Sequence, residues 1–341
     1  MKFYIYTKAE LDFIFDELSL FLRGLDGYVD IKQKCKNRTI GYKKIRFHQY
    51  SSGDYTLFMD ELENFPITAV DSADYIIVPI SIKLPDGVET KEYDFIIDEF
   101  LKHLKYFTSA PRKHLFFLVG DNAGSFSSLK NSLVFKASSM LFDKHSIPLY
   151  YTTPIAASDK LISDAKYDIS FQGCKHLHPT REKVLNYFSE TKIENTYLFF
   201  TDMYFENFDP ANQIKFQSEW QRVLESSKFI LCPRGRGIST IRLFESLFYG
   251  RIPIVYGDEC KLPLEDLIDY NQILIKIPEN EIVKSLDYIN HFKKSRDLLE
   301  CSKTARNVWN EYFNPKHFYC FLNRSIKNYE NKFNRRFIKF L

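Results

Sequence analysis

The sequence is poor in features that would indicate a function class by themselves. Its six cysteines stand singly, with no C-x-x-C pair, so neither a zinc knuckle nor a disulfide framework is indicated. The formal net charge is only +3, with both signs abundant, whereas a dedicated nucleic-acid binder normally carries a strong basic excess. We therefore expect no nucleic-acid partner.

Long apolar runs are also missing. The N-terminal stretch MKFYIYTKAELDF has no secretory apolar core because Lys8, Glu10 and Asp12 interrupt it. Nowhere does the chain hold the roughly 20 consecutive apolar residues that span a bilayer. The expectation is a protein of the reducing cytoplasm.

What the chain does have is length and apolar content. With 341 residues, 45% of them hydrophobic, it can bury a large core in about two domains. Apolar β-type runs alternate with helical patterns in two successive blocks, which predicts parallel sheets covered on both sides. We predict a first Rossmann-like domain over residues 1–160 and a second over 161–315, with a linker near 152–166.

The predicted elements of the first block are strands at 2–7, 74–80, 115–119 and 147–151 and helices at 11–25, 93–107 and 129–141, with 38–52 left unplaced. Those of the second are strands at 168–172, 197–201, 228–232, 252–256 and 273–277 and helices at 181–188, 214–226, 239–249, 281–292 and 296–312.

The last segment, residues 316–341, predicts a basic amphipathic helix. Apolar residues recur at spacings of three or four from Leu322 to Phe340, and six Lys or Arg residues stand against Glu330 alone. Such a helix can pack its apolar face back on the first domain or lie on an anionic membrane surface. Packing is the favoured prediction, and peripheral contact with the inner face of a membrane is the alternative.

The most informative stretch is Lys228–Asp269. A short apolar strand breaks at Pro233 into Arg234-Gly235-Arg236-Gly237, and Ser239 opens a segment with helical spacing. Glycines let a backbone approach an anion closely, and the N-terminal end of the new helix faces that anion with its N–H groups. The pattern predicts a phosphate site, although an ordinary backbone turn also fits Gly-x-Gly.

Two further residues fit the same site. Arg242 and Glu245 are three apart on the predicted helix and therefore lie on one face. They would offer a cation to a diphosphate and a carboxylate to a ribose diol, while an ion pair between the two is the structural alternative. Asp258 follows the next predicted strand and can contact a donor group or cap a turn.

The longer string resembles a known family. SKFILCPRGRG, ST-x-RLFESL, G-x-IPIVYGD and LPLEDLIDY are similar to the exostosin-type glycosyltransferase signature, in order over some forty residues. Weaker echoes are ADYIIVP from Ala73, HLFFLVGD from His114 and SFQG from Ser170. The resemblance implies a GT-B fold, two Rossmann-like domains facing each other across a cleft. It also implies sugar transfer from a nucleotide sugar with inversion at the anomeric carbon.

The resemblance gives the expected substrates and site residues. The donor is expected to be a UDP- or GDP-sugar, with no other cofactor, and the acceptor an oligosaccharide or lipid-linked glycan of a cell-surface polysaccharide or glycoconjugate. No D-x-D triplet occurs, so Arg side chains rather than a metal ion are expected to hold the diphosphate. The predicted donor-binding residues are Arg234, Gly235, Gly237, Ser239, Thr240, Arg242, Glu245 and Asp258, with further substrate contacts at Gly173, His176 and Arg181.

The catalytic base is sought at the C-terminal end of a strand in the first domain, because the acceptor enters there. Asp121 directly follows the strand at 115–119 and is the candidate, although an Asx-turn residue would look the same. His176 and His178 form an H-x-H pair without a third ligand in the sequence nearby, so no metal site is predicted.

Two other function classes compete with the glycosyltransferase. A catalytically silent relative could bind glycan or nucleotide as a partner of an active transferase, and donor hydrolysis or transfer would separate it from an enzyme. A dinucleotide-dependent oxidoreductase is disfavoured because Gly235-x-Gly237 lacks the third glycine and stands late in the chain.

Overall fold

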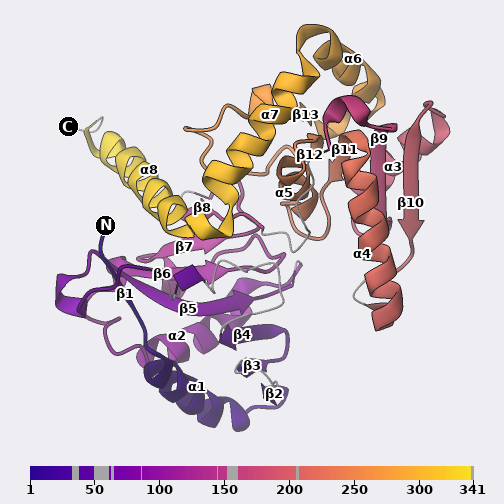
Figure 1. The fold of residues 1–341 in the computed structure, drawn as a ribbon. Helices are drawn as coiled ribbons and strands as arrows, with labels where there is room; N and C mark the ends of the chain where they lie inside the picture. Colours follow the sequence, from indigo (N-terminus) through magenta and orange to yellow (C-terminus); the bar gives the residue numbers. More distant parts are fainter. Residues whose placement is uncertain are drawn as a thin grey trace. The chain divides into compact units, whose positions relative to one another are not determined.

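A computed structural model of the chain describes residues 1–32, 38–49, 61–62, 65–85, 87–143, 145–151, 160–204 and 207–338 (Figure 1). The chain divides by its contacts into two units. Unit 1 comprises Met1–Leu149, Lys261–Leu264 and Pro315–Leu341, and unit 2 comprises Tyr150–Cys260 and Glu265–Asn314. The predicted domains divided the chain at residues 160 and 315, and most of the predicted linker lies outside the described residues.

Unit 1 is built on an eight-stranded mixed sheet. Its parallel strands are β1 (Phe3–Ile5), β5 (Tyr75–Lys83), β6 (His114–Leu118), β7 (Leu133–Lys136) and β8 (Ser146–Pro148). An antiparallel meander of β2 (Tyr28–Lys32), β3 (Arg38–Tyr42) and β4 (Ile45–Gln49) extends the sheet from β5. The first block was predicted to be parallel throughout, and the antiparallel meander corrects that prediction. Residues 38–49, for which no element was predicted, form β3, β4 and the turn between them.

Helices cover both faces of this sheet (Figure 1). On one face lie α1 (Lys8–Arg23), which begins with a Thr7–Glu10 capping box, and α2 (Asp94–Lys102). On the other lies α8 (Phe318–Ile338), where Phe318 and Phe321 contact Phe117 and Phe135 of the strands. Phe318, Phe321, Leu322 and Ile326, in the first half of the last helix, are therefore buried on unit 1.

Two predictions for unit 1 were wrong. The predicted helix over 129–141 is instead a strand, β7, because Val134 packs toward α1 and α2 while its neighbour Phe135 packs toward α8. The predicted end of a strand at Pro79 is also wrong, since β5 continues to Lys83. The pairing of β5 with β6 shifts between Ile77 and Ser81, and Pro79 lies in that gap, where no ladder bond needs its missing N–H.

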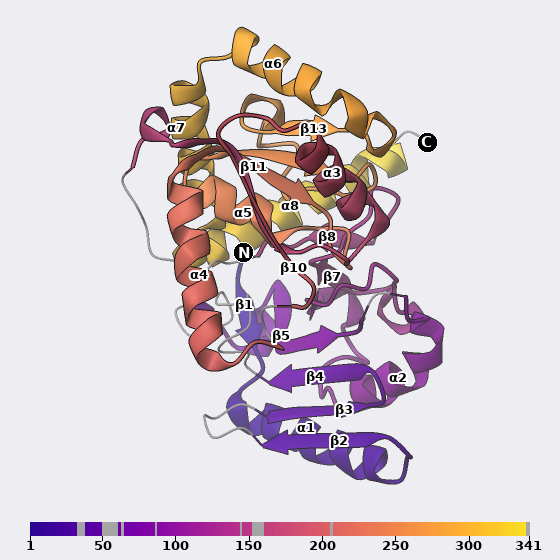
Figure 2. The same cartoon turned by 90° about the vertical axis from the view of Figure 1, so that its right-hand side faces the viewer.

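Unit 2 is built on a parallel five-stranded sheet in the order β10-β9-β11-β12-β13. In this sheet α3 and α6 pack on one face, whereas α4 and α5 pack on the other; Figure 2 shows α3 and α4 on opposite sides. The predicted strands and helices of this half are all present. The strands are β9 (Tyr167–Cys174), β10 (Thr196–Thr201), β11 (Ser227–Pro233), β12 (Ile252–Tyr256) and β13 (Ile275–Ile277), and the helices α3 (Pro179–Glu190), α4 (Pro210–Glu225), α5 (Ile241–Phe248), α6 (Ser285–Ser295) and α7 (Leu298–Val308).

The observed architecture confirms the α/β class, with parallel strands at the centre of each unit and helices on both faces. In the part of the chain that the structure describes, none of the helices combines the length and the apolar character needed to cross a membrane. Each sheet places the C-terminal ends of its parallel strands on one edge, and those edges are where α/β folds bind their ligands.

Candidate functional site

The strand order of unit 2 fixes where a ligand would bind. The chain runs from β9 to β10 on one side and then crosses to β11 on the other, so the connections diverge between β9 and β11. In doubly wound sheets, ligands bind at such a switch point, outside the carboxyl ends of the strands. Here those ends are Gly173-Cys174 and Pro233-Arg234, of which Gly173 and Arg234 are residues of the predicted site.

Arg181, in the first turn of α3, ties the two strand ends together. Its guanidinium donates to the carbonyl oxygens of Cys174 at 3.1 Å, Pro233 at 3.0 Å and Arg234 at 2.9 Å. The side chain is buried, and burial followed by the charge of Arg242 lowers its pKa to about 10. Arg181 was predicted to contact substrate, and the structure shows it as the residue that joins the ends of β9 and β11.

Arg242 stands beside it, on α5. Its Nη1 donates to Glu245 Oε2 at 2.6 Å, and its Nη2 donates to the carbonyl oxygen of Gln172 on β9 at 3.0 Å. The guanidinium also lies over the ring of Trp220, 4.5 Å from the ring centroid. These three contacts hold Arg242 in one orientation, with its side chain 17% exposed.

Glu245 forms an ion pair with Arg242, which is the structural alternative that the sequence left open beside contact with a ribose. Only 4% of the residue is exposed, and its Oε2 also accepts a hydrogen bond from Trp220 Nε1 at 3.0 Å. The contact with a ribose diol stays a prediction. Sequence reasoning missed Trp220, because nothing in the sequence indicates that a residue on α4 would reach the α5 pair.

The local charge balance favours an anion. The charge of Arg242 contributes to lowering the pKa of Arg181, and Glu245 forms its ion pair with Arg242. Arg234 and Arg236 add two more cations on the loop that follows β11. A buried positive charge without a carboxylate partner is costly, and a bound phosphate would relieve that cost.

Two glycines let the arginine side chains approach the backbone closely. A Cβ atom at Gly235 would lie 3.3 Å from Arg181 Nη2, and one at Gly173 would lie 3.4 Å from Arg242 Nη2. Gly173 also has a φ of 152°, a backbone conformation that favours glycine. Thr240 is the N-cap residue of α5, but its side chain makes no capping hydrogen bond. On the same turn, Gly237 is buried and Ser239 is half-buried.

The other strand ends of unit 2 add polar groups to this edge. Arg236 lies over the ring of Tyr204, after β10, at 4.6 Å from the ring centroid. His176, after β9, pairs with Glu182 at 3.1 Å and faces Asp202 at 3.9 Å. His178 instead caps α3, so the H-x-H pair diverges. Within the described ranges, no three His, Cys, Asp or Glu side chains are grouped so as to hold a metal ion.

Asp258 serves as a backbone cap. Its carboxylate accepts from the backbone N–H of Glu279, after β13, at 3.2 Å. The Glu279 side chain in turn accepts from the Thr180 hydroxyl at 2.5 Å. The sequence left two roles open for Asp258, contact with a donor group or capping of a turn. The structure shows a cap, and the turn that Asp258 caps follows β13. Glu279 is a carboxylate of this edge that no sequence pattern indicated.

The structure thus brings together six of the predicted residues, which are Gly173, Arg181, Arg234, Gly235, Arg242 and Glu245, whereas the proposed base lies in the other unit. Asp121 belongs to unit 1, where it follows β6 on the loop of Asn122. Asn122 shapes that loop by donating to the carbonyl oxygens of Pro85 and Val88, both at 2.8 Å, and by accepting from the N–H of Gly124 at 2.7 Å. Asp121 therefore stays a prediction.

A doubly wound unit with arginines at its switch point is the kind of site at which α/β folds bind phosphorylated ligands. Residues 23–291 match the model of the Exostosin GT47 domain. Because that match covers most of the chain, the chain belongs to this glycosyltransferase family.

Individual relatives agree with the family. The chain is 26% identical over 203 residues to Exostosin-1 homolog of Caenorhabditis elegans, a match covering 54% of this chain and 52% of that protein. It is 21% identical over 264 residues to Exostosin-1 of Drosophila melanogaster, covering 67% and 34%. A match to the probable arabinosyltransferase ARAD1 of Arabidopsis thaliana is 30% identical over 96 residues, covering 27% and 22%. The chain therefore spans about half of the first relative's length and a third of the second's.

Two solved structures also align with the chain. TarM covers 93% of this chain and 85% of its own at 10% identity, with a TM-score of 0.38. The glycotransferase of kitacinnamycin covers 80% and 73% at 11% identity, with a TM-score of 0.30.

Proposed function

We propose that the chain is an inverting, metal-independent glycosyltransferase that moves a sugar from a UDP- or GDP-sugar to a glycan acceptor. One observation carries the proposal. A chain of the exostosin GT47 family places the guanidiniums of Arg181 and Arg242 at the switch point of unit 2, where the carboxylate of Glu245 pairs with Arg242. This is an excess of buried positive charge where a diphosphate would sit.

The cations act on the leaving group. As the glycosidic bond breaks, negative charge develops on the departing diphosphate, and guanidiniums already held in place lower the barrier because they need not reorganise. Arg242 is the best placed of them, since Glu245, Gln172 and Trp220 fix its plane. Arg234 and the glycine loop would contact the same phosphates. In this proposal the arginines replace a divalent ion.

The acceptor hydroxyl needs a base. We assign Asp121 this role, because a carboxylate at the end of β6 can take the hydroxyl proton as the new bond forms. Asp121→Asn should abolish transfer while nucleotide affinity stays unchanged. Retained turnover would disqualify Asp121 as the base.

The direct test is donor turnover. We expect the wild-type protein to hydrolyse or transfer one donor from a panel of UDP- and GDP-sugars in the presence of EDTA, with release of UDP or GDP. Nucleotide binding without turnover of any donor would favour the catalytically silent partner instead. Turnover that requires added Mn²⁺ or Mg²⁺ would contradict the arginine mechanism.

We further propose that the reaction occurs in the cytoplasm, close to the inner face of the membrane, where lipid-linked acceptors for cell-surface glycans would be met. The second half of α8 supports this, because exposed Lys327 and Lys332 lie on a helix whose net charge is basic. Sedimentation with vesicles of anionic lipid, compared with vesicles of neutral lipid, would test the contact. Equal binding to both would contradict it.

A further inference from the structure

The loop after β6, residues 119–126, forms no helix or strand, yet its first half is fixed on the segment that follows β5. A Cβ atom at Gly120 would lie 2.7 Å from the carbonyl oxygen of Leu84, so a side chain there would collide with backbone. Asn122 donates its backbone N–H to the same oxygen at 3.2 Å. Asp121 stands between these two residues, so both of its neighbours in the chain are held in place.

The second half of the loop is fastened by Lys136, the last residue of β7. Its ammonium donates to the carbonyl oxygens of Ala123 at 2.6 Å and Gly124 at 2.9 Å. The same ammonium donates to Asp143 Oδ2 at 2.9 Å, on the loop after β7. One cation therefore joins the loop after β6 to the loop after β7.

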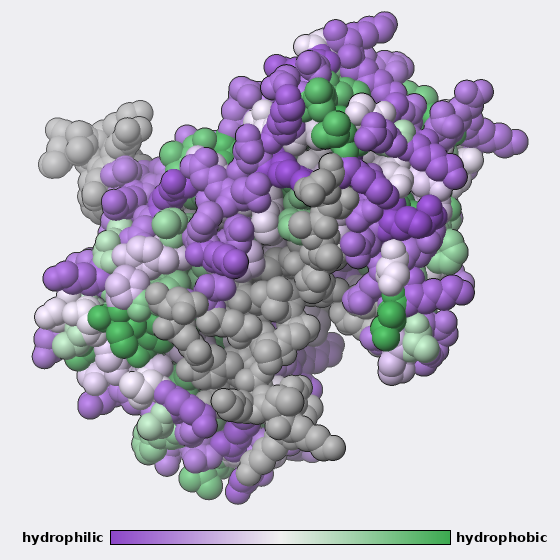
Figure 3. Space-filling view, viewed as in Figure 1, coloured by the Kyte–Doolittle hydropathy of each residue, from purple (hydrophilic) through white to green (hydrophobic). Residues whose placement is uncertain are grey.

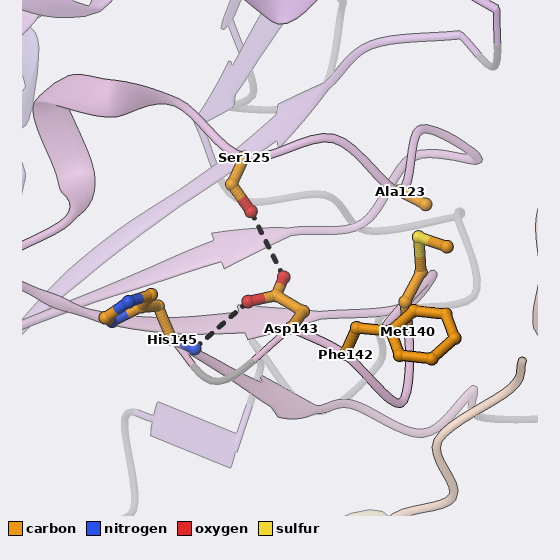
Figure 4. A pocket seen from close by; sticks show the side chains of 6 residues that line it. All are labelled: Ala123, Ser125, Met140, Phe142, Asp143 and His145. Carbon is orange, nitrogen blue, oxygen red and sulfur yellow. Dashed lines mark hydrogen bonds between the residues drawn. The ribbon is translucent and has the colours of Figure 1, made fainter.

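Asp143 makes the same connection through its carboxylate. Figure 4 looks into the pocket that the two loops line, and it shows this carboxylate between Ser125 and His145. Asp143 accepts from the Ser125 hydroxyl at 3.1 Å, on the loop after β6, and from the backbone N–H of His145 at 3.0 Å, on its own loop. Lys136 and Asp143 thus hold the two loops together as a pair.

A buried ion pair is an unusual choice for this position. The side chain of Lys136 is 1% exposed and that of Asp143 is 11% exposed, whereas charged groups ordinarily lie on a surface such as the mostly hydrophilic one in Figure 3. Taking both charges out of water costs free energy, and apolar side chains of similar volume often stabilise a protein as well as a buried ion pair does. What the charged pair adds is a set of directed hydrogen bonds that select one conformation of the loop after β6.

We propose that Lys136 is a positioning residue for transfer, which acts through the loop after β6 by holding Asp121 in one place. This inference rests on the proposed function, in which Asp121 takes the proton of the acceptor hydroxyl as the new bond forms. A base works only within hydrogen-bond reach of that proton, and a displacement of about 1 Å can lower the rate on the order of a hundredfold. Lys136 touches no reacting atom in this proposal; it fixes the loop that carries the base.

The first experiment measures the loop without any reaction. Amide hydrogen exchange is compared between wild type and Lys136→Met, which keeps a long side chain and removes the ammonium. We expect exchange over residues 119–126 to be faster by about tenfold or more in the variant, because hydrogen bonds from a charged group are lost. Equal exchange of this loop in the two proteins would overturn the inference.

The matched control is Lys261→Met. Lys261, in a short segment of unit 1 between β12 and β13, donates through Nζ to the carbonyl oxygen of Ser146 at 2.8 Å and so holds the far end of the loop after β7. This variant should leave exchange over residues 119–126 as it is in the wild type. Because Lys136→Met leaves the carboxylate of Asp143 buried without its cation, the double variant Lys136→Met/Asp143→Asn is measured as well, and it should show the same faster exchange.

The second experiment uses transfer. Lys136→Met and the double variant should lower kcat on the order of tenfold to a hundredfold and leave acceptor KM and nucleotide affinity unchanged, because the loop positions the base and does not bind the donor. Lys261→Met should change none of the three. An unaltered kcat in both Lys136 variants would overturn the inference, since a loss of stability alone does not change kcat per folded enzyme.

The proposed function can fail separately. Retained turnover in Asp121→Asn would overturn the inference, because Lys136 would then have no base to position. A wild-type protein that turned over no donor would defeat the proposed function and, with it, the role of Lys136 in transfer. The exchange experiment would still decide whether Lys136 holds the loop.

Discussion

At the scale of single residues, the two arginines of the switch point have different tasks. Arg181 is buried and donates hydrogen bonds to three backbone carbonyl oxygens. It therefore holds the ends of β9 and β11 in place. Arg242 makes one carbonyl bond and one ion pair and remains part-exposed. The residue that joins the strand ends is therefore distinct from the residue that is exposed enough to reach a ligand.

Arg242→Ala should weaken UDP or GDP binding by about tenfold or more, because a charge-assisted bond to phosphate is worth about 1.5–3 kcal/mol. The measurement is titration calorimetry in EDTA. Arg222→Ala is the matched control, since Arg222 forms an i,i+3 ion pair with Glu219 on the exposed side of α4. Equal affinities for wild type and Arg242→Ala would remove Arg242 from the diphosphate site.

Glu245 gives a prediction about the sugar of the nucleotide. If its carboxylate also accepts hydrogen bonds from a ribose diol, wild-type protein should bind UDP or GDP more tightly than the 2′,3′-dideoxy nucleotide, and Glu245→Gln should reduce that difference. Competition binding measures both ratios. Equal affinity of the wild type for the two nucleotides would leave Glu245 with its observed role, which is to orient Arg242.

At the scale of elements, the site depends on how strands end. Gly173 closes β9 with a φ of 152°, and a Cβ atom there would lie 3.4 Å from Arg242 Nη2. Gly173→Ala should therefore strain the backbone, destabilise the protein by about 1–3 kcal/mol and weaken nucleotide binding. Denaturant unfolding and calorimetry measure the two effects.

The control for that change is Gly24→Ala. Gly24 has a right-handed φ of −74° and only an ordinary contact at 3.6 Å, so alanine should be tolerated. Similar behaviour of the two variants would show that neither the conformation of Gly173 nor its approach to Arg242 matters.

The elements of unit 2 were predictable from the sequence, and part of unit 1 was not. Strand, glycine turn and helix follow one another locally around Gly235, and local order needs no knowledge of distant partners. β7 was mistaken for a helix because four residues are too few to establish a period, and its strand character comes from pairing with β6 and β8. Trp220 and Glu279 could not be foreseen because each reaches the site from a separate element.

At the scale of the whole molecule, each unit has its own core and its own edge of strand ends. The proposed donor site lies in unit 2, whereas the proposed base lies in unit 1. Under the proposed function, nucleotide binding is a property of unit 2, and transfer requires both units. Asp121→Asn should therefore leave nucleotide affinity unchanged.

The stability of unit 1 should fall in acid. Burial lowers the pKa of His114 to about 4, although its bond to the Ala110 carbonyl opposes this shift. The unfolded chain therefore binds a proton at a higher pH than the folded chain, and the stability present above the ordinary histidine pKa of about 6.5 is lost as the pH falls toward 4. The loss at about pH 4 should be about 3 kcal/mol.

Denaturant unfolding at neutral and acid pH, on wild type and His114→Gln, would measure this effect. The variant should lose less stability on acidification than the wild type does, whatever its stability at neutral pH. Equal acid dependence in the two proteins would contradict the assignment to His114.

The central claim is that arginines at the β9–β11 switch point, and no metal ion, hold the diphosphate of the donor. A crystal structure of the protein soaked with UDP and with GDP in the presence of EDTA tests it most directly. The account predicts the diphosphate against Arg242 and Arg234, over the Gly235–Gly237 turn. A nucleotide bound elsewhere, or bound only when a divalent ion is supplied, would contradict it.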